Sequence, residues 1–273
     1  MRREVRREVR IERQDHEGKV SGGRSGWMRC EMWGQKCSKV RRKKLIQHQP
    51  RGVGATAAAA ATQLLDVYSE LAERGEHLLG PLMTGTSLHQ WERFPEDDAI
   101  DSAGLYQWFY HCHEPEDRSG NPDEHGHLHL FARRPCWEKL ARSADEQAFH
   151  ELCGQHGQDP QTRHLVAIGL DPKGVPISLF MVNSWVTGDL MLNAVWTARL
   201  LSEIALDTGY PTIDRMIVST ITLCQGEIQQ LLVARDAALA THAAATVLED
   251  RALEVLAEVR LNMDALIARA LER

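Results

Sequence analysis

The chain has 273 residues, 43% of them hydrophobic, which is enough to bury an ordinary core in one domain with appendages. No apolar run is long enough to cross a membrane, no secretion signal opens the chain, and six scattered cysteines without a CxxC pair exclude a disulfide framework, so we expect a cytoplasmic protein with reduced thiols. The net charge of −6 is unevenly distributed, and the acidic body argues against nucleic-acid binding there.

The first 50 residues are strongly basic. They hold fifteen Lys and Arg against six Asp and Glu, whereas the rest of the chain holds 17 against 32. The absence of hydrophobic periodicity and the abundance of Gly, Arg and Lys are typical of a disordered extension, which we predict over residues 1–54. Its basic run at residues 41–44 is where nucleic acid or an anionic surface could be contacted.

The hydrophobic pattern becomes periodic from residue 55. Residues 57–75 predict an amphipathic helix, and residues 91–98 predict an irregular acidic loop. Residues 105–113 are rich in aromatic side chains, which favour a strand, and residues 125–133 alternate in the manner of a partner strand. The polar segment between them contains Pro and Gly, so the two strands are predicted to form a hairpin.

The second half of the chain predicts another hairpin and several helices. A capping box at residues 143–146 opens a short helix, and residues 165–170 and 175–182 flank a Pro- and Gly-containing turn. Everything after residue 187 has a helical pattern, in three segments at 189–206, 213–244 and 247–271. We therefore predict an α+β fold, with an antiparallel sheet of about four strands in two hairpins, packed with helices, and a helical C-terminal third.

We divide the chain into the basic extension, an α+β domain at residues 55–243 and an amphipathic helix at residues 244–273. The apolar residues of this last helix, from Leu248 to Ile267, follow a three-four spacing with Asn262 among them. Such a helix either docks on its own domain or pairs with a second copy in a homodimer.

Five histidines fall within nineteen residues: His111, His113, His125, His127 and His129. Alternate side chains of a strand share a face, so the first two lie on one face of their strand and the last three on one face of theirs. If the strands pair about the loop at 114–124, His111 faces His127 and His113 faces His125. Opposed side chains are about 5 Å apart at Cβ, so the imidazoles form one patch.

Neutral imidazoles in a partly covered patch are good ligands for zinc, iron, manganese or copper. We predict His111, His113, His127 and His129 as metal ligands, and His125 or Glu124 as the group that transfers protons. The acidic loop offers further oxygen ligands: Glu114, Glu116, Asp117, Asp123 and Glu124. The alternative is that these histidines are solvated or hydrogen-bonded beneath a helix. Among the isolated histidines, His164 is the best placed because it opens the strand that leads into the second hairpin.

Two functions are compatible with such a patch. The leading hypothesis is a metal-dependent enzyme, such as a hydrolase or oxygenase, acting on a small molecule at an open coordination position. The other is a noncatalytic protein that stores, senses or delivers a metal ion or haem, for which a saturated site is expected.

Two resemblances cover this region. Residues 125–131, His-Gly-His-Leu-His-Leu-Phe, resemble the histidine-triad signature, which implies nucleotide hydrolysis or transfer. Over residues of about 88–238 the chain resembles a bacterial domain family of unknown function, through this segment and those at 164–168, 179–188 and 231–236. That resemblance implies one domain and no activity. These segments also contain Asn183, Trp185, Arg235 and Asp236, which we expect either to line a cofactor pocket or to cap and pack helices.

Overall fold

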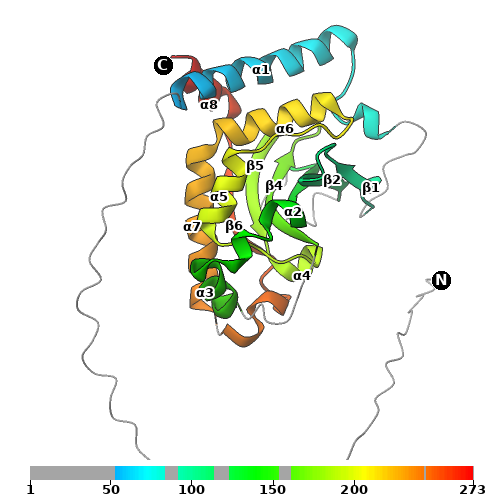
Figure 1. Ribbon diagram of the computed structural model, residues 1–273. Helices are drawn as coiled ribbons and strands as arrows, with labels where there is room; N and C mark the ends of the chain where they lie inside the picture. The colour runs from blue at the N-terminus through cyan, green and yellow to red at the C-terminus, as the bar shows by residue number, and fades with distance from the viewer. Residues whose placement is uncertain (1–52, 84–91, 114–122, 154–160, 243, 273) are drawn as a thin grey trace, which may run out of the picture. The chain divides into compact units, whose positions relative to one another are not determined.

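The computed structural model describes residues 53–83, 92–113, 123–153, 161–242 and 244–272 (Figure 1). The helices are α1 (Val53–Arg74), α2 (Arg134–Trp137), α3 (Ala144–Cys153), α4 (Ser184–Thr187), α5 (Ala194–Ser202), α6 (Pro211–Leu223), α7 (Gln225–Thr241) and α8 (Met263–Leu271). The strands are β1 (Phe94–Ile100), β2 (Tyr106–Cys112), β3 (Gly126–Arg133), β4 (Thr162–Leu170), β5 (Pro176–Val182) and β6 (Val255–Arg260). Short 3₁₀ helices cover Gly80–Leu82, Leu140–Arg142 and Ala244–Glu249. None of the helices in the described ranges has the length and apolarity to span a bilayer.

The strands form one antiparallel sheet in the order β1-β2-β3-β4-β5-β6, so each strand pairs with its neighbour in the sequence. The predicted α+β class and antiparallel sheet are confirmed, with six strands in the described part of the chain where about four were expected. The two predicted hairpins form its four central strands. Most of the predicted basic extension lies outside the described residues.

One face of the sheet carries the main core. The side chains of Tyr106, Trp108 and Tyr110 on β2 and of Leu128 and Leu130 on β3 are buried there, because every second side chain of a strand lies on the same face. Helix α7 packs against β5 and β6, α5 packs against α7, and α1 packs against α6 and α8 (Figure 1). A polar contact ties the two layers together, because the indole Nε1 of Trp108 donates to Oδ1 of Asp214 on α6 at 3.0 Å.

The two strands that the sequence pattern missed are the edges of the sheet. Residues 94–98 were predicted as part of the acidic loop at 91–98 but belong to β1, which pairs irregularly with β2. Residues 255–260 were predicted as helical but form β6, which pairs with the outer edge of β5. Both strands are only partly buried along their length. Exposed edge strands lack a continuous apolar face, so their alternation is weak.

The helical prediction for the C-terminal third needs three corrections. The helix expected at 247–271 is instead the end of a 3₁₀ segment, β6 and α8, so its apolar spacing does not form a coiled-coil seam. The helix expected at 213–244 is divided into α6 and α7 at Cys224. The helix expected at 189–206 begins only at Ala194, because the side chain of Asn193 caps its N-terminus by accepting from the amide of Trp196.

The packing of α1 on the domain gives a matched pair of substitutions. Leu64 is 1% exposed and its neighbour Leu65 is 47% exposed on the same helix. We expect Leu64→Ala to lower the free energy of unfolding by about 2–5 kcal/mol because it leaves a cavity. Leu65→Ala should change it by no more than about 0.5 kcal/mol. Urea denaturation followed by circular dichroism measures both, and equal effects would contradict the packing of α1 described above.

Candidate metal centre

The pairing of β2 with β3 brings the histidines together on the face of the sheet opposite the main core. His111 lies directly opposite His127, and Phe109 lies opposite His129, so the predicted register is confirmed. Phe109 and Phe131 share this face and stack with their ring centroids 5.6 Å apart. The candidate centre is therefore a histidine cluster bordered by aromatic rings on a rigid hairpin.

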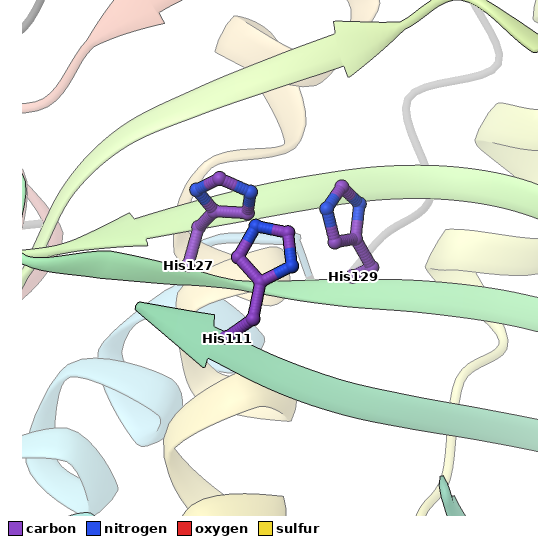
Figure 2. A group of neighbouring side chains, drawn as sticks. All are labelled: His111, His127 and His129. Atoms are coloured by element: carbon purple, nitrogen blue, oxygen red, sulfur yellow. The ribbon is translucent and has the colours of Figure 1, made fainter. Parts of the chain in front are cut away.

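Three of these rings form what we call the three-histidine group: His111, His127 and His129. Figure 2 shows the rings turned toward one another, with a nitrogen of each ring directed into the space between them. One ligand nitrogen from each ring lies within 4.8 Å of the others. The ring centroids of His111 and His127 are 4.2 Å apart, and those of His127 and His129 are 4.7 Å apart. Such a group offers three of the ligands that a tetrahedral zinc site uses.

A second set of ligand atoms, the His-Glu group, lies on the other side of His127. It consists of His113, Glu124 and His127, which are at most 5% exposed. Oε1 of Glu124 lies 2.7 Å from Nδ1 of His127 and 3.4 Å from Nε2 of His113. The same two histidine nitrogens are 3.4 Å apart. The ring of His127 therefore belongs to both groups and presents its Nδ1 to this one.

The carboxylate of Glu124 is held in place by β4 and β5. Its Oε2 accepts a hydrogen bond from Oγ of Ser178 at 3.1 Å. Gly169 leaves room for it, because a Cβ built on this residue would lie 2.4 Å from Oε2 of Glu124 and 2.2 Å from Oγ of Ser178. Only a residue without a side chain fits between these groups, so the sheet itself positions the carboxylate.

His129 is supported by His164 on β4, a residue that the sequence pattern left among the isolated histidines. Nδ1 of His129 lies 3.1 Å from Nε2 of His164. Burial, reinforced by the neighbouring histidines, lowers the pKa of His129 well below its usual value, and burial lowers the pKa of His164 to about 3. Both rings are therefore neutral near pH 7. Nε2 of His129 is buried and has no hydrogen-bond partner among the described residues, as expected of a nitrogen that binds a metal ion.

The three-histidine group opens onto a cavity of about 480 Å³, a size typical of small-molecule pockets. The cavity is lined by Arg93, Phe109, His111, His129, Trp185, Val186, Thr187 and Glu254. The guanidinium of Arg93 lies 4.4 Å from the ring centroid of Phe109. Arg93 and Glu254 were not singled out by the sequence pattern, because Arg93 lies just before β1 and Glu254 just before β6, the two strands that it missed.

The remaining predicted site residues lie elsewhere. His125 is outside both groups, with its Nδ1 2.9 Å from the hydroxyl of Tyr110, and its acid-base role stays a prediction. Asn183 caps α4 and donates to the carbonyl oxygens of Val247 and Leu253. Trp185 lines the cavity. Among the predicted oxygen ligands, Asp123 is exposed, and the loop residues Glu114, Glu116 and Asp117 are outside the described residues.

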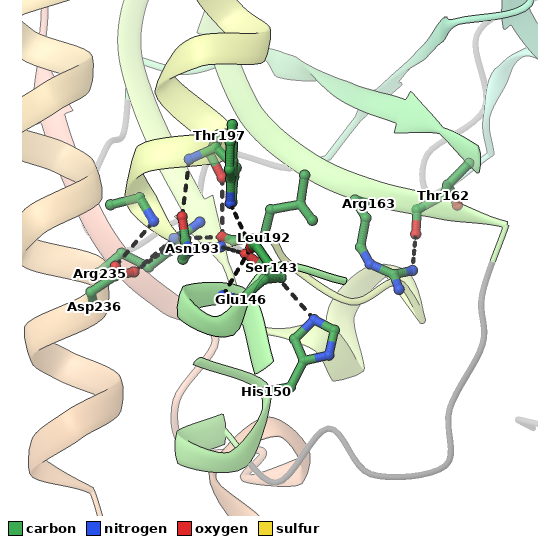
Figure 3. Close-up of polar contacts among 12 residues, drawn as sticks. Ser143, Glu146, His150, Thr162, Arg163, Leu192, Asn193, Thr197, Arg235 and Asp236 are labelled. Carbon is green, nitrogen blue, oxygen red and sulfur yellow. Dashed lines mark hydrogen bonds and ion pairs between the residues drawn. The ribbon is translucent and has the colours of Figure 1, made fainter. Parts of the chain in front are cut away.

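Arg235 lies in the helical layer away from the cavity wall. It is fully buried, and it donates to Oδ1 of Asp236 and to the carbonyl oxygen of Leu192 (Figure 3). Arg235 and Asp236 form an ion pair in which the guanidinium is buried. Its positive charge contributes, after burial, to the low pKa of His164. It therefore influences the histidine cluster electrostatically, through His164.

Comparison with known families identifies the domain. A family model described as a domain of unknown function, DUF6969, matches residues 58–261. The chain belongs to this family. No curated protein and no solved structure matches the chain. The match to DUF6969 extends on both sides of the predicted range of about 88–238 and ends one residue after β6, so the edge strands and both ligand groups belong to the DUF6969 domain.

The close packing of Glu124 and Ser178 against Gly169 in the DUF6969 domain can be tested by substitution. We expect Gly169→Ala to lower the free energy of unfolding by about 1–3 kcal/mol, because the added methyl group displaces Glu124 or Ser178. Gly226→Ala is the control, since nothing lies within 4 Å of its added Cβ and alanine favours the helix by about 1 kcal/mol. Urea denaturation of both variants gives the comparison. A Gly169→Ala variant as stable as the parent would mean that Glu124 is not confined as described.

Proposed function

We propose that this DUF6969 protein is a metal-dependent enzyme. In the proposed site a transition metal ion is bound by His111, His127 and His129, and a small-molecule substrate occupies the adjoining cavity. A metal ion with three protein ligands keeps a coordination position for water or substrate and acts there as a Lewis acid. Zinc, iron, manganese and copper are all compatible with three imidazole ligands.

The observation that carries the proposal is the convergence of three ring nitrogens at the wall of a cavity. Nε2 of His129 is buried without a hydrogen-bond partner among the described residues, which is costly unless an ion or solvent occupies the space. The neutral state of His129 suits a ligand, because a protonated imidazole cannot bind a metal ion.

The surroundings of the ligands also fit a metal site. Ligating histidines are usually held by an outer partner, a group that contacts the second ring nitrogen and fixes the tautomer and orientation of the ring. Glu124 lies at Nδ1 of His127 in this way, and His164 lies at Nδ1 of His129. In the tautomers with a proton on each Nδ1, both rings present Nε2 as the ligand atom.

The adjoining cavity favours an enzyme over a noncatalytic metal or haem binder. A protein that only stores or delivers an ion gains nothing from a pocket that places Arg93 and Glu254 beside the ligands. These two charged side chains could orient a polar substrate and transfer protons at the metal. The histidine-triad alternative gives no role to His111, whose ring contacts that of His127.

The proposal predicts metal in the protein as purified. We expect full-length protein expressed without an affinity tag to contain a transition metal ion in elemental analysis. His129→Ala should weaken the metal affinity by more than about 100-fold, because loss of an outer partner alone costs about 10–100-fold. His242→Ala is the control, since His242 pairs with Asp250 outside both ligand groups. Less than about a tenth of an equivalent of metal, with no uptake on titration, would overturn the proposal.

A further inference from the structure

Beyond the single metal ion of the proposed function, we propose that the His-Glu group is a second metal site. Nδ1 of His127 would bind this second ion, while Nε2 binds the ion of the three-histidine group. The imidazole ring of His127 would thus bridge two metal ions. This inference rests on the proposed function, because it shares His127 with the first site.

The spacing of the ligand atoms supports this second site. Two ligands of a tetrahedral ion are about 3.4 Å apart when metal–nitrogen bonds are about 2.0–2.1 Å long. Nε2 of His113 lies 3.4 Å both from Oε1 of Glu124 and from Nδ1 of His127. The third separation, 2.7 Å between Glu124 and His127, is that of a hydrogen bond. A metal ion would replace the shared proton, which leaves to solvent, so that the bridging ring becomes an imidazolate.

The composition and burial of the group also fit a cation. Two imidazoles and one carboxylate form a common ligand set for iron and zinc. Glu124 is 1% exposed, and burial of its negative charge is favoured by a positive ion beside it. Ser178 and Gly169 fix the second oxygen of this carboxylate, leaving Oε1 directed at the two histidines.

Each group has its own opening to the surface. His111 and His129 of the three-histidine group line the cavity of about 480 Å³, together with Arg93 and Trp185. His113 and Glu124 of the His-Glu group line a different cavity of about 500 Å³, together with His125, Asp123 and Asp171. A metal ion could therefore enter the second site through an acidic opening without passing through the substrate cavity.

The competing interpretation is that Glu124 only orients His127 as an outer partner of a single metal ion. The two interpretations differ in the number of ions bound. If Glu124 is an outer partner, the parent protein binds one ion, and Glu124→Gln lowers the affinity for that ion by about 10–100-fold. If Glu124 is a ligand, the parent binds two ions and the variant retains one.

The test is equilibrium dialysis of the full chain against zinc after chelator treatment, followed by elemental analysis. We expect two equivalents for the parent and one for both Glu124→Gln and His113→Gln, with circular dichroism checking that each variant folds. Glu146→Gln should keep two equivalents. It is a matched control, because Glu146 is equally buried and lies 3.1 Å from His150 (Figure 3), away from both groups.

Copper(II) titration monitored by electron paramagnetic resonance tests the bridge. Two copper ions joined by one imidazolate couple magnetically, so the signal should weaken as the second equivalent binds to the parent but not in Glu124→Gln. A parent that saturates at one equivalent of zinc overturns the second site and leaves the proposed function standing. Two equivalents in Glu124→Gln, or two uncoupled copper signals, also overturn it. A parent that binds no zinc overturns both proposals.

Discussion

The backbone hydrogen bonds between β2 and β3 set the register in which His111 lies opposite His127. Because side chains alternate between faces, a slip of one residue would move the imidazoles of one strand into the main core. Trp108 and Leu130, which are buried on the opposite face, make such a slip costly, since it would expose them. The indole of Trp108 is also tied to Asp214 on α6. The same pairing that buries the core therefore aligns the ring nitrogens of the histidines on the other side of the sheet.

Much of this arrangement could be predicted from local patterns in the sequence. The four central strands are buried on both faces or alternate strongly, so their sequences clearly indicate strands. Once the hairpin is assumed, the alternation also places His111 opposite His127. β6 could not be predicted in the same way. Its residues have high helix propensity and a three-four apolar spacing, and they adopt an extended conformation because β5 offers hydrogen-bonding partners along its edge. Tertiary pairing here outweighs local preference.

The contacts within the site that the sequence pattern did not predict depend on irregularities that a pattern does not reveal. His164 would share the core face with Ile168 if β4 alternated regularly. The pairing of β3 with β4 shifts between Leu130 and Phe131, and this bulge turns His164 toward His129 instead. The position of Glu124 likewise depends on Gly169 and Ser178, which come from two other strands and contact it only in the folded sheet. Long-range contacts of this kind have no sequence period.

The late position of β6 in the chain has a consequence for biosynthesis. β5 is almost wholly apolar and buried, yet its outer edge is covered by a strand that follows four α-helices and more than seventy intervening positions in the sequence. Until the ribosome has released that segment, β5 presents open amide and carbonyl groups on a hydrophobic strand, which is the kind of surface that promotes aggregation. The side chain of Asn183, which donates to the carbonyl oxygens of Val247 and Leu253, ties the end of β5 to the segment just before β6. Nascent or truncated chains that stop before β6 would depend on chaperones to remain monomeric.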